Sequence, residues 1–404
     1  MGPRNLFKWI LILALVAAVV GTASALFLWS LDLVTRTRIG APWLIFLLPI
    51  AGLAMGFYYR HQGSHVSSGN HSILSSVHKK STALPHSLAP SIVISTLVTH
   101  LFGGSAGREG TAMQMGAGLA TTCGGRFITS KKGTQLLISC GIAAGFGAVF
   151  GTPFAGAIFG LEFIRKRFIS PSIIPCLLTA LAADQVCHLW GTHHTPYPAI
   201  AFRFDPSSIL NLSLKILVAS ALFALACRLF IVSAHWVAGK FQQYVPHQAL
   251  KAALGGLLVI GLFLLSGTSD YLGLGVLPAD DNSLTLPRFF SPEVQAPAYA
   301  WLWKLVFTIV TLGAGFKGGE VTPLFFIGAA LGNSLAWFFN APVDLFAGLG
   351  MIAFFAAATK TPFASFVMGL ELLGLPVAIP LALATLITTK LSGPRSVYPD
   401  IRNL

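Results

Sequence analysis

Apolar stretches of very different length alternate with short polar connections along the whole chain. They lie near residues 9–30, 41–59, 87–103, 134–164, 170–190, 209–238, 249–266, 299–315, 323–339, 344–358 and 363–389. Helices that cross a bilayer along its normal would give more uniform stretches of about 20 residues. Gly and Pro interrupt related places, as at Thr152-Pro153 and Thr361-Pro362. The pattern predicts an all-α polytopic membrane protein of tilted, broken helices, which is typical of transport sites.

The chain consists of two related halves. GREGT at 107–111 returns as GGEVT at 318–322, and TPFAxxxxGLE occurs at both 152–162 and 361–371. The spacing between the two motifs is nearly the same in each half. We therefore predict a first membrane repeat, a linker, a second membrane repeat and a short tail without a soluble regulatory domain, at 1–192, 193–208, 209–391 and 392–404.

Composition supports a membrane location. Hydrophobic residues make up 54% of the chain, charged residues 10%, and the mean hydropathy is +0.75. The net charge of +13 lies mostly between apolar segments or beside their ends, which indicates membrane topology rather than nucleic-acid binding. The apolar stretch 9–30 is too long for the h-region of a signal peptide, so we expect it to be a retained first span, and we expect a cytoplasmic N-terminus.

The paired motifs have the features of an anion site. Glycines that precede a helix allow backbone amides to approach a ligand, and a helix N-terminus carries free donors and a positive dipole end. A glutamate there is useful only if its charge is conditional. Glu109 can occupy the site when ionised and leave it when protonated, which exchanges a proton for an anion. We expect the same functional importance for Glu320, with a helix-capping role as the alternative for both.

The second pair of glutamates has a different setting. Glu162 and Glu371 follow Gly-Leu at the far ends of apolar helices, and Arg165 lies one turn beyond Glu162. Their spacing favours interfacial or ion-paired structure over a part in a proton path.

These motifs resemble those of the CLC family of anion channels and proton-coupled antiporters over nearly the whole chain. GREGT resembles the family's GREGP segment, GGEVTP its GGxFxP segment, and Tyr398 its C-terminal pore-facing tyrosine. The resemblance implies two inverted-topology repeats, a homodimer with one ion pathway per subunit, and a gating glutamate at Glu109. The ion-binding residues that it implies are Asn70, Gly107, Arg108, Gly110, Thr111, Gly319, Glu320, Val321, Thr322 and Tyr398.

Departures from the chloride-type motifs resemble the fluoride-specific branch of that family. Asn70 stands at the central serine position, Thr111 replaces a proline, and the second motif carries Glu320 and Thr322. The internal proton glutamate of the family aligns with Phe163.

Fluoride is small and tightly hydrated, so its site must supply strong donors such as amides and hydroxyls. Phe150 and Phe154 are candidates for ring edges that face fluoride, with core packing as the alternative. Alternatives also remain for the polar candidates, since Asn70 suits a turn, Thr322 a helix cap and Tyr398 a membrane interface.

Metal, cofactor and enzyme chemistry is not expected. The histidines His61 and His65, and the pair His193-His194, lie in polar connections without nearby acidic residues in the sequence. The five cysteines form no C-x-x-C pair, and no nucleophile elbow or nucleotide loop is present.

The resemblance to the fluoride-specific branch implies a transporter of the bacterial inner membrane that exports fluoride from the cytoplasm in exchange for protons. The alternative is a chloride/proton antiporter or a passive chloride channel of the same fold. The expected partners are the two transported ions, membrane lipid and a second copy of the chain, without nucleic acid.

Overall fold

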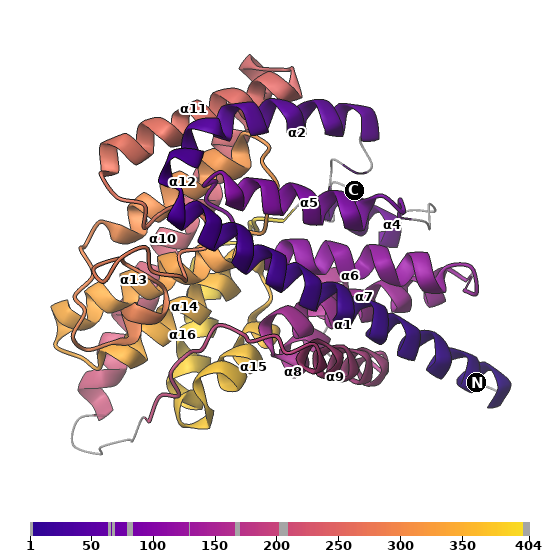
Figure 1. The fold of residues 1–404 in the computed structure, drawn as a ribbon. Coiled ribbons are helices and arrows are strands. Elements are labelled where there is room, and N and C mark those ends of the chain that lie inside the picture. The colour runs from indigo at the N-terminus through magenta and orange to yellow at the C-terminus, as the bar shows by residue number, and fades with distance from the viewer. Residues whose placement is uncertain are drawn as a thin grey trace.

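The described chain is almost entirely helical (Figure 1). A computed structural model describes residues 3–63, 66, 69–78, 84–128, 130–165, 170–201 and 209–398. In chain order, the first half contains α1 (Pro3–Gly40), η1 (Pro42–Leu47), α2 (Leu48–Gln62), α4 (Asn70–His78), α5 (Leu88–Leu101), α6 (Glu109–Gly124), α7 (Lys131–Phe150), α8 (Pro153–Arg165) and α9 (Ile173–Leu189). The second contains α10 (Ile209–Tyr244), α11 (Gln248–Ser266), η2 (Pro287–Phe290), α12 (Ala300–Gly313), α13 (Val321–Phe339), α14 (Val343–Thr359), α15 (Pro362–Leu373), η3 (Leu375–Val377) and α16 (Ala378–Leu391). No β-strand forms among these residues, so the predicted all-α class is confirmed.

Six helical segments of the described chain are long and apolar enough to cross a membrane, and the remaining apolar helices are shorter. They comprise α1, η1 together with α2, α7, α10, α11 and α13. The first predicted span, 9–30, lies inside α1, which extends beyond it at both ends to 38 residues. A helix of that length measures about 57 Å, well above the thickness of a bilayer core, so it must tilt or emerge from the membrane. In Figure 1, α1 crosses the first half obliquely.

Two apolar stretches that look continuous in the sequence are each broken into two helices. Stretch 134–164 divides at Gly151, which has φ +71°, and Pro153 then starts α8. In the second half Lys360 adopts φ +61° just before Pro362 starts α15, and stretch 363–389 breaks again at Gly374. A left-handed residue ends each first helix and proline suits the start of the next. The expectation of broken helices in both halves is therefore confirmed.

The same close helix pair occurs in each half. In the first, α6 packs on α7 where Gly116 meets the carbonyl of Gly141. In the second, α13 packs on α14 where Gly328 meets the carbonyl of Gly350. A β-carbon at Gly116 or Gly328 would overlap that carbonyl oxygen, so only glycine allows the backbones to approach this closely. These rigid pairs hold the N-termini of α6 and α13, which carry the two glutamate motifs.

The halves also meet through α8 and α15, which cap each other. The Glu162 carboxylate near the end of α8 accepts hydrogen bonds from the amides of Phe363 and Ala364 at 3.4 and 2.9 Å. The Glu371 carboxylate near the end of α15 accepts from the first amides of α8 at 3.1 and 2.8 Å. The two helices therefore run antiparallel, and each glutamate satisfies free donors of the other helix.

The predicted ion pair of Glu162 stays a prediction. Its described partners are amides of a helix N-terminus, and the side chain of Arg165, the partner expected in an ion pair, lies outside the described residues.

Candidate functional site

The two glutamate motifs meet in the middle of the molecule as an antiparallel bridge. The Gly107 amide donates to the Gly319 carbonyl at 2.6 Å, and the Gly319 amide donates to the Gly107 carbonyl at 2.7 Å. A β-carbon on Gly319 would lie 2.5 Å from the Gly110 amide nitrogen, so a side chain cannot be accommodated there. The bridge brings the N-termini of α6 and α13 against each other. Both ends present free amide donors and positive dipole ends to one place.

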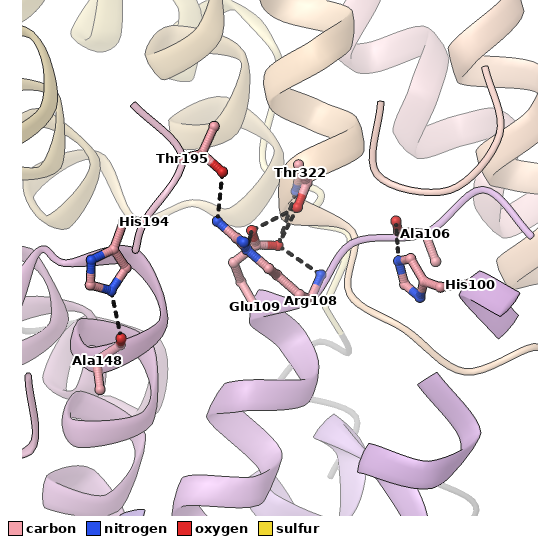
Figure 2. Close-up of polar contacts among 8 residues, drawn as sticks. All are labelled: His100, Ala106, Arg108, Glu109, Ala148, His194, Thr195 and Thr322. Carbon is pink, nitrogen blue, oxygen red and sulfur yellow. Dashed lines mark hydrogen bonds and ion pairs between the residues drawn. The ribbon is translucent and has the colours of Figure 1, made fainter. Parts of the chain in front are cut away.

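The Glu109 carboxylate occupies that place. The Thr322 hydroxyl lies 2.6 Å from Oε1 and 2.7 Å from Oε2, and the Thr322 amide donates to Oε2 at 3.1 Å. The Arg108 amide also donates to Oε2 at 3.1 Å. Glu109 is only 1% exposed, so its side chain is shielded from water. A carboxylate oxygen therefore receives the amide and hydroxyl donors that a small anion would need (Figure 2).

Arg108 connects the carboxylate to a cavity on one side. Its Nε lies 3.4 Å from Glu109 Oε1, and its Nη2 donates to the Thr195 hydroxyl at 3.1 Å. Figure 2 shows this guanidinium between Glu109 and Thr195. Arg108, His194 and Thr195 line a cavity of about 480 Å³. Arg108, whose guanidinium lies within 4 Å of the carboxylate, thus also lines this cavity.

A second cavity, of about 230 Å³, is lined by the remaining polar candidates. Asn70, Glu320 and Tyr398 all line it, which unites three residues that are far apart in the sequence. The Gln114 amide donates to Asn70 Oδ1 at 2.9 Å, so the Asn70 oxygen is occupied. Glu320 Oε2 and the Tyr398 hydroxyl are buried and have no hydrogen-bond partner within the described residues.

The Glu109–Thr322 contact belongs to neither cavity lining. The two linings share no residue among those described, and neither includes Glu109 or Thr322. Glu109 contacts the first lining through Arg108. Its helix approaches the second lining at Gly110, where a β-carbon would lie 3.4 Å from Glu320 Oε2. The N-terminus of α6 therefore lies close to residues of both cavities.

Two predicted ion-binding residues have other contacts. The Thr111 hydroxyl shares a 2.6 Å hydrogen bond with Thr96 on α5, not with the Glu109 carboxylate. Val321 is buried and begins α13, one residue before the threonine that holds the carboxylate.

Phenylalanine rings form a packed cluster beside the site. Phe163, at the position of the expected proton glutamate, packs edge-on against Tyr398 with ring centres 5.0 Å apart and stacks on Phe159. Phe150 joins the cluster at 5.5 Å from Phe325. Phe154 does not, since its side chain is 51% exposed at the start of α8. Phe154 is therefore not in a position to face an ion at Glu109.

His194 has an acidic residue nearby in space, although none lies near it in the sequence. Asp184 and His188 of α9 lie beside it, and one ligand atom from each of the three residues falls within 4.8 Å of the others. His193 and His61 are exposed, and His65 lies outside the described residues.

Sequence reasoning missed Thr195 and Gln114. Thr195 lies in the expected linker and Gln114 in the middle of α6, without a motif around either that marks it. Their importance comes from one hydrogen bond each, to Arg108 and to Asn70.

Known proteins resemble this chain in sequence and fold. A family model described as voltage gated chloride channel matches residues 50–393. A chloride/fluoride channel protein of Pseudomonas syringae pv. tomato is 40% identical over 400 residues, which cover 97% of this chain and 85% of that protein. The crystal structure of a CLC-type fluoride/proton antiporter is 30% identical, with a TM-score of 0.91 over 99% of this chain and 98% of that one. A slow cyanobacterial chloride/proton antiporter is 20% identical with a TM-score of 0.82 over 98% and 97%, and shows the fold alone.

Proposed function

Because this chain belongs to the voltage-gated chloride channel family, whose members move anions across membranes, we propose that it is a proton-coupled fluoride antiporter. The observation that carries the proposal is the contact between Glu109 and Thr322. The carboxylate stands in for a fluoride ion, since each of its oxygens takes up donors that a bare anion would require.

Exchange follows from the chemistry of the carboxyl group. When Glu109 is ionised, it fills the anion site and closes the path between the two cavities. Protonation removes the negative charge, weakens the hydrogen bonds from Thr322 and Arg108, and leaves the donors to fluoride. Loss of the proton to the opposite side reverses the step. One carboxyl group thus carries the proton and competes with the anion.

Several donors support a preference for fluoride. The Thr322 hydroxyl and the amides of Arg108 and Thr322 meet at the Glu109 carboxylate. Strong, closely placed donors offset the large dehydration cost of a small halide better than that of chloride. Glu320 and the Tyr398 hydroxyl, at the second cavity, receive or release the ion in this scheme. The fluoride/proton antiporter at 30% identity is consistent with it.

The surrounding assembly is also proposed. We assign residues 1–192 and 209–391 to two inverted repeats, joined by linker 193–208 and followed by tail 392–404. From the family we expect a homodimer in the bacterial inner membrane that exports fluoride from the cytoplasm while protons enter. Gly107, Gly110 and Gly319 then serve as the close-packed backbone of each ion pathway.

The test is efflux from proteoliposomes loaded with equal fluoride and chloride, followed with one electrode for each anion and a pH electrode outside. We expect selective fluoride efflux that draws protons inward, even against their gradient. Comparable chloride efflux would instead place the chain among chloride/proton antiporters. Fluoride efflux without proton movement would contradict coupling.

A further inference from the structure

Three side chains outside the anion pathway meet where α9 and the linker come together. Asp184 and His188 lie one turn apart on α9, and His194 follows in the linker. One ligand atom from each lies within 4.8 Å of the other two. A carboxylate with two imidazoles is the donor set that zinc and related transition-metal cations take up.

The Asp184 carboxylate lacks a hydrogen-bond partner for one oxygen within the described chain. Its Oδ1 is buried and accepts no hydrogen bond from the described chain. The nearest basic atom is His188 Nδ1, at 3.5 Å. A buried carboxylate without a strong partner is costly, and a bound cation would remove that cost.

In each histidine one ring nitrogen is hydrogen-bonded to a carbonyl, which leaves the other nitrogen available to bind a metal. His194 Nε2 lies 2.9 Å from the Ala148 carbonyl (Figure 2), so the proton on that nitrogen leaves Nδ1 with a free electron pair. His188 Nδ1 lies 2.9 Å from the Asp184 carbonyl, which leaves its Nε2 free in the same way. Hydrogen bonds of this kind orient metal-bound histidines.

We propose that Asp184, His188 and His194 form a binding site for a divalent cation of the zinc type. Two ligands of one tetrahedral zinc lie about 3.3 Å apart, so the cluster must contract slightly on binding. The His188 side chain is 48% exposed and the Asp184 side chain 8%, so His188 has more room to shift toward its partner. His194 lines the 480 Å³ cavity, from which water can complete the coordination.

The site connects to the anion pathway through the next residue. Thr195 accepts the hydrogen bond from Arg108, whose guanidinium contacts the Glu109 carboxylate. A metal that fixes His194 also fixes Thr195 and restricts Arg108. On the proposed function of Glu109, bound zinc therefore slows fluoride/proton exchange.

Binding is tested by calorimetric titration of the detergent-solubilised full chain with zinc chloride at neutral pH. We expect one site, with an affinity that falls by more than roughly tenfold in His188→Ala, since even indirect contacts of a metal contribute that much. Asp184→Asn should have a similar effect. His193→Ala, which alters an exposed neighbour outside the cluster, is the matched control and should bind normally. Absence of binding in the wild type, or equal binding by His188→Ala, would overturn the site.

Regulation is tested separately in proteoliposomes, with zinc chloride added on each side in turn. Zinc should slow fluoride efflux in the wild type and in His193→Ala, and His188→Ala should transport normally but resist zinc. Equal inhibition of His188→Ala would overturn the link to transport. Zinc binding by a protein that moves no fluoride would support the site while contradicting the proposed function.

Discussion

Glu109 and Glu320 occupy matching positions in the two repeats, yet their surroundings differ. The oxygens of Glu109 are held by Thr322 and the Arg108 amide. Oε2 of Glu320 has no such partner in the described structure and lies beside the smaller cavity. In the proposed scheme one copy of the motif therefore fills the anion site, while the other copy lines the approach to it.

Glu162 and Glu371 give the opposite result. Each accepts two backbone amides from the helix of the other half, so their contacts are equivalent. The two repeats thus have equivalent contacts at Glu162 and Glu371, which hold helices together. They have different contacts at Glu109 and Glu320, where we propose that the ion passes. In the proposed scheme the Glu109 carboxylate moves and fluoride takes its place, whereas a carboxylate that caps a helix stays where it is.

The largest effect is expected from Glu109→Gln. The amide side chain cannot carry the proton or the charge that competes with fluoride, so coupled exchange should fall to background. Fluoride and proton fluxes in proteoliposomes measure it, with Glu320→Gln as the control in the matching position. Coupled fluxes that survive in Glu109→Gln would remove the proposed mechanism.

Thr322→Val should have the next largest effect. It removes the hydroxyl that contacts both carboxylate oxygens and, in our scheme, the fluoride that replaces them. A hydrogen bond to a charged group contributes about 1.5–3 kcal/mol, so fluoride binding should weaken by about 10- to 150-fold. Calorimetry measures the affinity, and Thr322→Ser should restore most of it. Unchanged affinity in Thr322→Val would assign the residue to helix capping alone.

Glu320→Gln should act more weakly and on transport only. Because Oε2 makes no hydrogen bond within the described residues, stability should not fall. Fluoride turnover should decrease by about fivefold, equivalent to roughly 1 kcal/mol, because the amide side chain cannot carry a proton at the second cavity. Thermal unfolding and flux measured on the same preparation separate the two effects. A stability loss without slower transport would show that Glu320 is a structural cap.

The smallest effect on transport is expected from Glu162→Ala and Glu371→Ala. Each should lower the free energy of unfolding by a similar amount, about 1–3 kcal/mol, because buried amides lose their acceptor. The fluoride-to-chloride preference should remain. Unfolding in detergent tests the symmetry, and the Gln variants, which keep an acceptor oxygen, are the controls. Loss of proton coupling in a stable Glu162→Ala would place this residue on the proton path instead.

The sequence predicts the helical class from its apolar stretches with their Gly and Pro interruptions. It predicts both glutamate motifs because the same short sequence occurs twice. It also predicts the break at Thr152-Pro153, but not the division at Gly374, since apolar composition continues through that position. The two helices there are separated by backbone geometry, to which hydropathy is insensitive.

Contacts between the halves are harder to predict. The partner of Glu162 is a backbone amide of Ala364, and any residue type at that position supplies one. The approach of Asp184 to His194 depends on how the linker folds back onto α9. Thr322 is part of a motif, but its contact with Glu109 exists only because Gly319 pairs with Gly107.

The most direct test of the central claim is the number of protons taken up when fluoride binds. Calorimetric titrations in buffers of different ionisation enthalpy give this number for the wild type and for Glu109→Gln. If the Glu109 carboxylate and fluoride compete for one site, the wild type should take up about one proton per fluoride near neutral pH, and the variant none. Fluoride binding without proton uptake in the wild type would contradict that competition.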